Sequence, residues 1–491
     1  MSNQRSPSLR LNFLMNIILT MSSFVFPLIT FPYTSRVLMA DGNGKIQMAS
    51  SIISYFVLLA QLGIPTYGVR VCASIRGDRA KLTKTVHELF ALQMITMLVS
   101  YLFFVVCMMF IPKMKNEREL YIITSSMILL NSISMEWLYR ALEEYTYITS
   151  RSLVFKVISV IAMFLMVHSK EDYLLFAGIQ VLASAGSYLM NLVQLPRYIG
   201  LKPVGNYNIR QHLKPVFVLF AYVGATTIYT NLDSVMLGFM LTDADVGYYG
   251  VAVKIKNILV SIVTALATVM LPRVSYYYEQ RLLEKFWDMA AKAFRVVLLM
   301  AVPLTVYFMI FARHGIFFLS GNMYEPSIIP MIVIMPTLIC IGLTSVTGVQ
   351  ILIPSKREYI VLLAAVAGAV VDLILNVLLI PSLRSTGAAI GTLAAEVVGL
   401  LIHMAVLKKN LVPLRKSVGI GMICGAAVIS ALASFWVMFL QVSDFIVLAV
   451  SAMVFFGVYL LVLYLFKDPF VMLGEEKLLA VLKLRGKRSQ Q

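Results

Sequence analysis

The sequence predicts an all-α integral membrane protein with about fourteen transmembrane helices. Apolar stretches recur along the whole chain, each near the roughly 20 residues that a helix needs to cross the hydrocarbon. Hydrophobic residues make up 60% of the 491 residues and charged residues 13%, a balance far from that of a soluble domain. Basic residues gather in every second gap between the apolar stretches, which is the positive-inside pattern. The three observations agree on a multi-pass membrane protein.

The expected spans follow one another with short gaps. The first, residues 11–37, contains Arg36 as its single charge, and the second, 46–69, contains none. The others are expected at 85–111, 120–140, 152–168, 173–196, 215–241, 246–271, 293–312, 326–353, 359–381, 386–407, 417–440 and 444–466. The longest outer gap, 313–325, has no room for a catalytic domain, which argues against a membrane glycosyltransferase or polymerase.

The charges of the gaps predict the orientation. About three quarters of the 41 lysines and arginines fall in segments that alternate along the chain, and we assign these to the cytoplasmic side. Arg140, Arg151 and Lys156 form one such segment. The even number of spans then places both termini in the cytoplasm. Because the basic residues behind the net charge of +17 are dispersed among helix ends, nucleic-acid binding is not expected.

Two similar lobes and an appendage are the expected organisation. One constant shift along the chain overlays spans 1 and 2 on spans 7 and 8. The shift superimposes three identical pairs: Leu38 and Leu241, Gly44 and Gly247, and Ala49 and Ala252. We therefore expect a lobe of helices 1–6 at 1–212, a lobe of helices 7–12 at 213–410, and a central cavity between them. Helices 13 and 14 with a basic cytoplasmic tail would occupy 411–491.

Charged residues inside spans are candidates for function, because each costs a few kcal/mol at bilayer depth. Asp233 in span 7 and Lys254 in span 8 both lie about eight residues, or roughly 12 Å, from the outer end. One interpretation is a structural ion pair. Lys256 favours a second interpretation, because residues two apart point to different helix faces. One lysine would then neutralise Asp233 and the other would bind a negatively charged ligand.

Asp372 in span 11 and Glu396 in span 12 form a second group near mid-bilayer, and His403 follows Glu396 on the same helical stripe. Two neighbouring carboxylates raise each other's pKa, so the group suits a proton or a cation. Hydrogen bonding between helices by protonated acids is the alternative. Gly387 and Gly391 have the small-xxx-small spacing that predicts close helix packing.

Further candidates lie near span ends. Arg36, Arg70, Arg140 and Glu88 occupy such positions. Snorkelling of the basic side chains to the interface is one explanation, and lining of a cavity is the other. The four cysteines lack metal-ligand spacing and no phosphate-binding loop is present, so we expect neither a metal nor a nucleotide cofactor.

Several blocks of the sequence resemble the Wzx-type polysaccharide repeat-unit flippases. The blocks are Phe31-Pro32-Tyr33-Thr34-Ser35-Arg36-Val37-Leu38, Leu62-Gly63-Ile64-Pro65-Thr66-Tyr67-Gly68-Val69-Arg70, Glu136-Trp137, Gly247-Tyr248-Tyr249, Leu271-Pro272-Arg273 and Gly387-Ala388-Ala389-Ile390. They run in order over residues 10 to about 400. The chain departs from the family at Met39, where Gly is usual, and at Asp372, where Asn is expected.

The resemblance implies a two-lobed, fourteen-helix transporter of the bacterial plasma membrane and not an enzyme. Its cargo would be an undecaprenyl-diphosphate-linked oligosaccharide, moved from the inner to the outer leaflet by alternating access for capsule, O-antigen or exopolysaccharide synthesis. Its surroundings would include membrane lipids, a polysaccharide polymerase and glycosyltransferases. A multidrug exporter of the same superfamily and a lipid II flippase are the alternatives. Coupling to a proton, to sodium or to the membrane potential is left open.

With such a cargo in view, the charged candidates fall into two groups. The cations expected to bind the diphosphate in the cavity are Lys254, Lys256, Arg36, Arg70 and Arg140. The residues expected to form ion pairs or to couple an ion are Asp233, Asp372, Glu396, His403 and Glu88.

Overall fold

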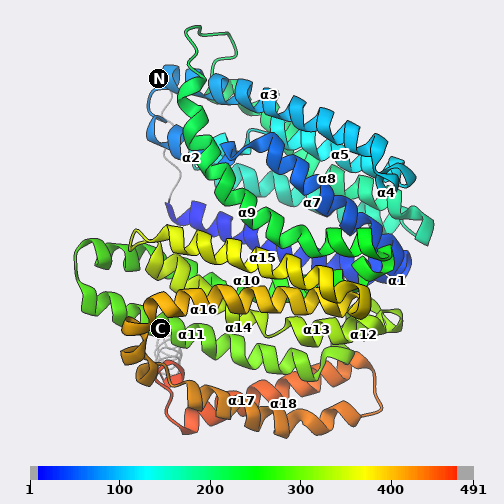
Figure 1. The fold of residues 1–491 in the computed structure, drawn as a ribbon, viewed down its shortest axis with the longest axis vertical. Helices are drawn as coiled ribbons and strands as arrows, with labels where there is room; N and C mark the ends of the chain where they lie inside the picture. The colour runs from blue at the N-terminus through cyan, green and yellow to red at the C-terminus, as the bar shows by residue number, and fades with distance from the viewer. Residues whose placement is uncertain (1–8, 473–491) are drawn as a thin grey trace, which may run out of the picture. The chain divides into compact units, whose positions relative to one another are not determined.

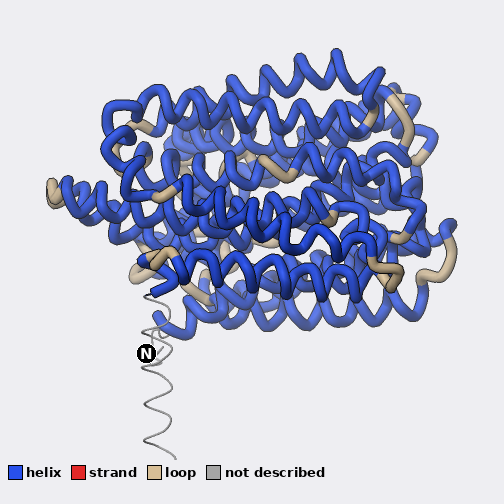
Figure 2. Tube along the Cα trace, turned by 90° about the horizontal axis from the view of Figure 1, so that it is seen from below, coloured by secondary structure: helices blue, strands red, loops and turns tan. Residues whose placement is uncertain are grey.

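The computed structural model describes residues 9–472, which fold into helices joined by turns and short loops (Figures 1 and 2). Eleven of the described helices are long and apolar enough to cross a membrane, or twelve if the bent pair Asn322–Ile334 and Thr337–Leu352 is one span. The predicted all-α, multi-pass membrane fold is therefore confirmed. The count of about fourteen spans stays a prediction, and the basic tail from residue 473 lies outside the described residues.

The described helices pack into two compact units, one up to Gly250 and one from Val251 onward. The first half of the chain contains α1 (Leu9–Gln61), α2 (Ile64–Ser74), α3 (Arg79–Phe110), α4 (Pro112–Asn116), α5 (Arg118–Ile133), α6 (Glu136–Ala141), α7 (Tyr145–Met166), α8 (Tyr173–Tyr198), α9 (Arg210–Met240) and α10 (Asp243–Glu279). The second half contains α11 (Leu283–Ile310), α12 (Ala312–Ser320), α13 (Ile328–Ile334), α14 (Thr337–Thr344), a π-helix (Ser345–Leu352), α15 (Glu358–Leu383), α16 (Ser385–Val418), α17 (Ile420–Ser434) and α18 (Asp444–Leu465).

Helix α1 contains both of the first two expected spans. Its 53 residues would extend about 80 Å at 1.5 Å per residue, far more than the roughly 30 Å hydrocarbon core. The helix is broken at Met39, whose φ of 56° and ψ of −171° lie outside the helical region. The Asn43 side chain holds the break, because its amide donates to the carbonyls of Thr34 at 3.0 Å and Met39 at 2.8 Å. Figure 1 shows the two arms of α1 in blue.

A reciprocal contact between two glycines joins α1 to the start of α10. A Cβ on Gly44 would lie 1.7 Å from the carbonyl oxygen of Asp243 and 2.9 Å from the backbone nitrogen of Gly247. A Cβ on Gly247 would lie 2.1 Å from the carbonyl oxygen of Ala40. Under the shift that overlays Gly44 on Gly247, Ala40 falls on Asp243. The two contacts are therefore equivalent by the internal repeat, and only glycine allows the backbones to approach this closely.

In the second unit, the expected close approach of α15 and α16 is present. A Cβ on Gly387 would lie 2.6 Å from the backbone of Leu379. A Cβ on Gly391 would lie 2.5 Å from Oδ1 of Asn376 and 2.8 Å from Oδ1 of Asp372. The small-xxx-small pair thus brings the polar edge of α15 directly against α16.

The expected tenth span is not one straight helix. It breaks by 43° between Ile334 and Thr337, and Pro336 lies at the break. Proline has no N–H for the helical ladder, which explains the position of the bend. The segment then continues through α14 into the π-helix Ser345–Leu352.

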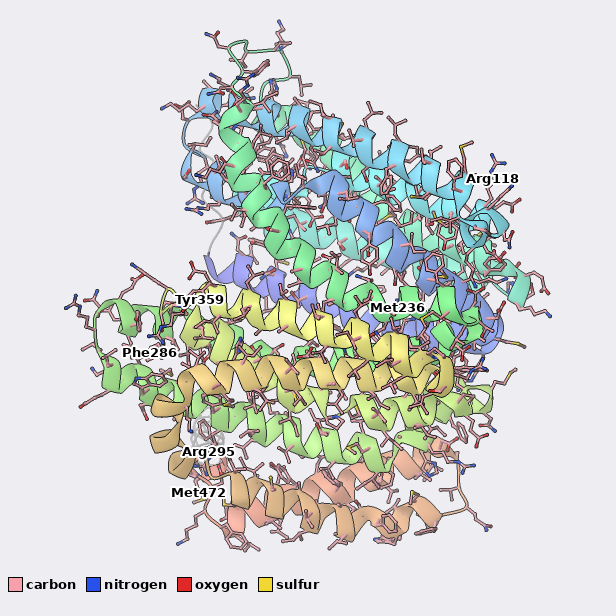
Figure 3. The ribbon with its side chains drawn as sticks, viewed as in Figure 1. Arg118, Met236, Phe286, Arg295, Tyr359 and Met472 are labelled. Carbon is pink, nitrogen blue, oxygen red and sulfur yellow. The ribbon has the colours of Figure 1, made fainter. Side chains whose placement is uncertain are left out.

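An ion pair fastens the end of the described chain to α11. Arg295 donates from Nη2 to Oδ2 of the fully buried Asp468 at 2.6 Å. The other carboxylate oxygen accepts the backbone N–H groups of Phe470 at 2.8 Å and Val471 at 3.4 Å. Figure 3 labels Arg295 and Met472, the last described residue. This pair fixes the exit of α18 against the core of the second unit.

The glycine contact predicts a specific sensitivity to a single methyl group. Gly44→Ala and Gly247→Ala should each destabilise the protein by about 1–3 kcal/mol or more, because the added Cβ meets backbone atoms that cannot rotate away. The matched control is Gly178→Ala in α8, where a Cβ meets no atom within 4 Å, and which should leave stability unchanged or slightly higher. Thermal unfolding of the purified variants in detergent measures the difference. Equal unfolding temperatures for Gly44→Ala and Gly178→Ala would contradict the contact.

Candidate functional site

Three neighbouring cavities lie within the first unit, and their linings overlap. The central cavity has a volume of about 320 Å³ and shares Asn131 with a cavity of about 480 Å³. It shares Gln180 and Ser184 with a third cavity of about 370 Å³. The second and third are called the Arg140 cavity and the Lys156 cavity, after the basic residue in each lining. The three cavities form a row in which neighbours share lining residues, and we refer to this row as the track.

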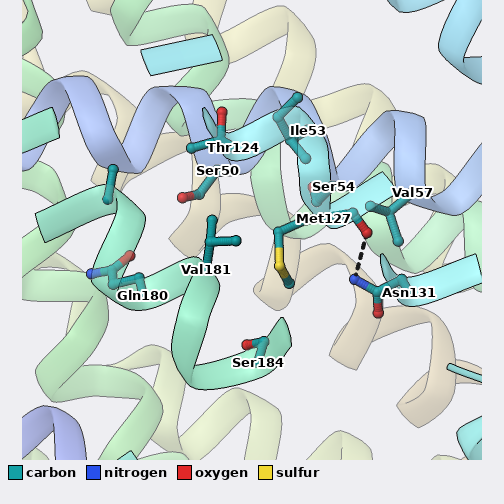
Figure 4. Close-up of a pocket in the computed structure, with 11 residues that line it drawn as sticks. Ser50, Ile53, Ser54, Val57, Thr124, Met127, Asn131, Gln180, Val181 and Ser184 are labelled. Carbon is teal, nitrogen blue, oxygen red and sulfur yellow. Dashed lines mark hydrogen bonds between the residues drawn. The ribbon is translucent and has the colours of Figure 1, made fainter. Parts of the chain in front are cut away.

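The central cavity combines hydroxyl and amide groups with aliphatic side chains (Figure 4). It is lined from α1 by Ser50, Ile53, Ser54 and Val57, from α5 by Thr124, Met127 and Asn131, and from α8 by Ala177, Gln180, Val181 and Ser184. The amide of Asn131 donates to the carbonyl of Met127 at 2.9 Å. Such a lining suits an uncharged polar ligand, because it offers hydrogen bonds without a fixed charge.

One polar stripe on α8 borders all three cavities. Gln180, Ser184 and Tyr188 stand four residues apart and therefore share one helix face. The first two line the central and Lys156 cavities, and Tyr188 lines the Arg140 cavity. This four-residue spacing is visible in the sequence, but the sequence does not show which helices face the stripe, so it did not predict a cavity.

The Arg140 cavity holds a charged cluster. The Glu136 carboxylate accepts Nε and Nη2 of Arg140 at 3.0 and 2.7 Å, and Nη2 of Arg151 at 3.2 Å. Arg151 is 2% exposed at its side chain and also donates to the carbonyl of Ser187, whereas Arg140 is 52% exposed. Two guanidinium groups thus share one carboxylate, and the cluster has a net charge of about +1. Trp137 and Tyr145 add aromatic surface to the same cavity.

Arg151 and Lys156, assigned to a cytoplasmic segment, belong to a helix that begins earlier than the expected span. Both lie within α7, which begins at Tyr145 and not near 152. Glu136 and the Ser187 carbonyl satisfy the Arg151 guanidinium, so the helix can bury it. Lys156 lies near the middle of α7, where its ammonium donates to the hydroxyls of Ser22 at 2.8 Å and Ser23 at 3.3 Å.

The other predicted cavity cations do not line these three cavities. Arg36 is exposed and donates to the carbonyl of Pro32 at 2.6 Å, and Arg70 is exposed near the end of α2. Neither lines the three cavities of the first unit. Lys254 and Lys256 are half-buried on α10.

The predicted acidic residues lie in different surroundings. Asp233 is buried on α9 and accepts a hydrogen bond from the hydroxyl of Tyr249. Asp372 is fully buried beside Asn376 at the Gly391 contact. Glu396 is half-buried and lies on α16 more than one turn beyond Gly391.

His403 lies against the π-helix. Its Nδ1 is 2.8 Å from Oγ1 of Thr347, and a Cβ on Gly348 would lie 3.1 Å from its ring. Both His403 and Thr347 are buried. Short π-helical segments are frequent at functional sites. The His403–Thr347 contact is therefore a second candidate polar site of the later half of the chain, beside the one at Asp372.

Glu88 organises the segment that leads into α9. Its carboxylate accepts the backbone N–H of Asn208 at 2.7 Å, the amide of Gln211 at 3.1 Å and Nε2 of His212 at 2.9 Å. The hydroxyl of Tyr67 lies 2.9 Å from Nδ1 of the same histidine. Glu88 and His212 are both buried. The described contacts of Glu88 therefore fasten α3 to the entry of α9.

Comparison with known proteins identifies the relatives of this chain. The sequence pattern of the family described as "Polysaccharide biosynthesis protein" matches residues 9–278. A protein of Escherichia coli (strain K12) named "Putative O-antigen transporter" is 23% identical over 407 residues, which is 80% of this chain and 95% of that protein.

Two solved structures share the fold. Lipid II flippase MurJ, in an inward closed conformation, matches with a TM-score of 0.75 at 15% identity, over 94% of this chain and all of that chain. An inward-facing multidrug resistance transporter of the MATE family matches with a TM-score of 0.55 at 14% identity, over 82% of this chain and 99% of that chain. At these identities the likeness concerns the fold alone.

The charged cluster predicts a difference between buried and exposed arginines. Arg151→Gln should destabilise the protein by about 1–3 kcal/mol, because Glu136 and the Ser187 carbonyl each lose a charged hydrogen-bond donor. The control Arg76→Gln breaks an ion pair with Glu143 at 2.7 Å whose side chains are 51% and 42% exposed, and should cost about 0–1 kcal/mol. Thermal unfolding in detergent compares the two. A larger loss for Arg76→Gln would show that Glu136 does not depend on Arg151.

Proposed function

Because the chain belongs to the family of polysaccharide biosynthesis proteins, we propose that it is a flippase for lipid-linked oligosaccharides. The relative that covers most of the chain is named as an O-antigen transporter, and the most similar fold reported above is that of a lipid flippase. The observation that carries the proposal is this track of cavities, because the polar and charged side chains in its lining, placed among membrane-crossing helices, suit a hydrophilic cargo.

The cargo that fits this track is an undecaprenyl-diphosphate-linked repeat unit. Its lipid tail stays in the bilayer, so that the protein shelters only the diphosphate and the sugars. Hydroxyl, amide and aromatic groups line the cavities, and these are the groups that bind sugars by hydrogen bonds and ring contact. Movement of the negative charge out of a cell with an inside-negative potential is favoured by about 2.3 kcal/mol per charge per 100 mV.

Arg140 is the proposed contact for the diphosphate within the first unit. Its guanidinium lines the largest of the three cavities and is half exposed. Nη2 of Arg140 lies 2.7 Å from Oε1 of Glu136. A diphosphate would compete with that carboxylate for the guanidinium. Arg36, Arg70, Lys254 and Lys256 remain proposed contacts for the same negative charge elsewhere along the route.

The acidic residues are proposed for coupling. Asp372, Glu396 and His403 would exchange a proton or a sodium ion in the second half of the chain, where buried polar groups gather at the Gly391 contact and at the π-helix. Asp233 is proposed as a partner for a lysine of α10. Glu88 is proposed to hold the entry of α9 in place during transport. We also place the protein in the bacterial plasma membrane with both termini in the cytoplasm, beside a polymerase and glycosyltransferases of the same pathway.

A transport assay with two cargoes tests the function. The purified protein is reconstituted into vesicles that contain a fluorescent undecaprenyl-diphosphate-linked oligosaccharide, and a sugar-cleaving enzyme outside reports the exposed fraction. We expect that fraction to rise only in vesicles with the protein, and faster under a potential that drives negative charge toward the enzyme. The same vesicles loaded with ethidium provide the comparison for the multidrug exporter. Transport of ethidium without movement of the lipid-linked sugar would refute the flippase.

The lysines of α10 give a second test within the same assay. Lys254→Gln and Lys256→Gln remove charge, while Lys→Arg at each position keeps it. If one lysine binds the diphosphate, its Gln variant should lose at least about tenfold in transport rate and its Arg variant should keep part of it, as expected for loss of a charge-assisted hydrogen bond. Lys170→Gln, at a side chain that is 67% exposed, is the control. Normal transport by both Gln variants would remove these lysines from the route.

A further inference from the structure

Lys156 is half-buried and has hydroxyl partners, unlike several basic side chains of the first unit. Three of those, which are buried or half-buried, each pair with a carboxylate: Arg151 with Glu136 at 3.2 Å, Lys45 with Glu117 at 2.9 Å, and Lys113 with Asp243 at 2.9 Å. Lys156 forms no ion pair with any residue of the range 9–472. It also lies about half-way along α7, one of the helices able to cross the membrane. A charged lysine at such a depth is costly, because its ammonium group leaves bulk water.

The contacts of Lys156 leave room for a negatively charged ligand. An ammonium group has three N–H donors, and two of them reach the hydroxyls of Ser22 and Ser23. Neutral hydroxyls satisfy hydrogen bonds but do not neutralise the charge. The ring of Phe26 lies 5.8 Å from Nζ and contributes only a weak attraction.

The cavity beside Lys156 supplies further groups that suit an oxyanion. It has a volume of about 370 Å³, and Gln180 and Ser184 of α8 lie in its lining. In the described part of the chain the side chains of these two residues make no hydrogen bond. The lysine ammonium, an amide N–H and a hydroxyl therefore face one space. Carboxylate and phosphate groups are the ligands that use charged and neutral donors together.

The distance along α7 separates this cavity from the proposed diphosphate contact. Tyr145 lines the Arg140 cavity, and Lys156 follows it eleven residues later, about 16 Å along a helix. A cargo with its diphosphate at Arg140 would therefore present a later part of its sugar chain to Lys156. A charge at that point would belong to a sugar and not to the diphosphate.

We propose that Lys156, with Gln180 and Ser184, binds the carboxylate of an acidic sugar in the transported oligosaccharide. The inference rests on the proposed flippase function and narrows its substrate class to repeat units that contain a uronic acid. The ion pair with the sugar would supply the counter-charge that the protein itself does not provide at this position.

Binding of soluble sugars to the full-length protein in nanodiscs tests the site directly. The probes are digalacturonate, its neutral counterpart galactobiose, and inorganic phosphate, each followed by isothermal titration. We expect digalacturonate to bind more tightly than galactobiose, and Lys156→Gln to weaken it at least about tenfold, as for a lost charge-assisted hydrogen bond. Lys156→Arg should keep more affinity than Lys156→Gln. The matched control Lys170→Gln, which removes the same charge from an exposed side chain, should bind like the wild type.

Thermal unfolding separates a binding role from a structural one. Lys156→Gln removes a buried charge that has no acidic partner, so its unfolding temperature should be equal to or higher than that of the wild type. A marked loss of stability, or unchanged binding of digalacturonate by Lys156→Gln, would overturn the proposal. Tight binding of inorganic phosphate without binding of digalacturonate would also overturn it, and would assign the cavity to the diphosphate.

The flipping assay keeps this proposal distinct from the function itself. Lys156→Gln should slow the transport of a uronic acid repeat unit at least about tenfold more than that of a neutral repeat unit. If wild-type protein moves neither cargo while it still binds digalacturonate, the flippase function fails and the anion site stands. If it moves both and the variant is equally fast with both, the anion site fails and the function stands.

Discussion

The cost of placing charge in hydrocarbon shapes the arrangement of the first unit. Glu136 illustrates it, since one carboxylate serves two guanidinium groups and allows Arg151 to be nearly inaccessible within a membrane helix. Glu88 does the same for the entry of α9 through three hydrogen bonds. These pairs fix which helices stand beside each other, and the helices in turn define the cavities. Lys156 departs from this arrangement, because its ammonium meets hydroxyl groups where the arginines meet a carboxylate. For that reason it is the side chain on which we base the anion site.

The glycine contact matches the internal repeat that the sequence predicts. Gly44 and Gly247 overlay under one shift, and each lies against the backbone partner that the shift requires, Asp243 for the first and Ala40 for the second. Such reciprocity is expected when two equivalent helix ends meet about an approximate two-fold axis. A residue with any side chain at either position would force the backbones apart.

Much of the fold and part of the site were predictable from local patterns. Apolar length, alternating basic gaps and the Gly387–Gly391 spacing predicted spans and a helix contact because each depends on neighbouring residues only. The start of α7 at Tyr145 differs from the expected 152, because apolar length alone does not show that Glu136 can pair with Arg151 inside the helix. The π-helix and its contact between His403 and Thr347 depend on residues 56 apart, which no single-sequence pattern reports.

The carboxylate shared at the Arg140 cavity has a consequence for turnover. An anionic cargo bound at Arg140, as proposed, would compete with Glu136 for the guanidinium, so the protein would contain its own competitor for the site. The competition lowers affinity, since the free energy of the new ion pair is offset by that of the old one. Lowered affinity is a disadvantage for a protein that only binds its ligand. It is an advantage for a carrier, because a tightly bound cargo is released slowly. When the cargo leaves, Glu136 returns to the guanidinium and the emptied site is neutralised without a counter-ion from solution.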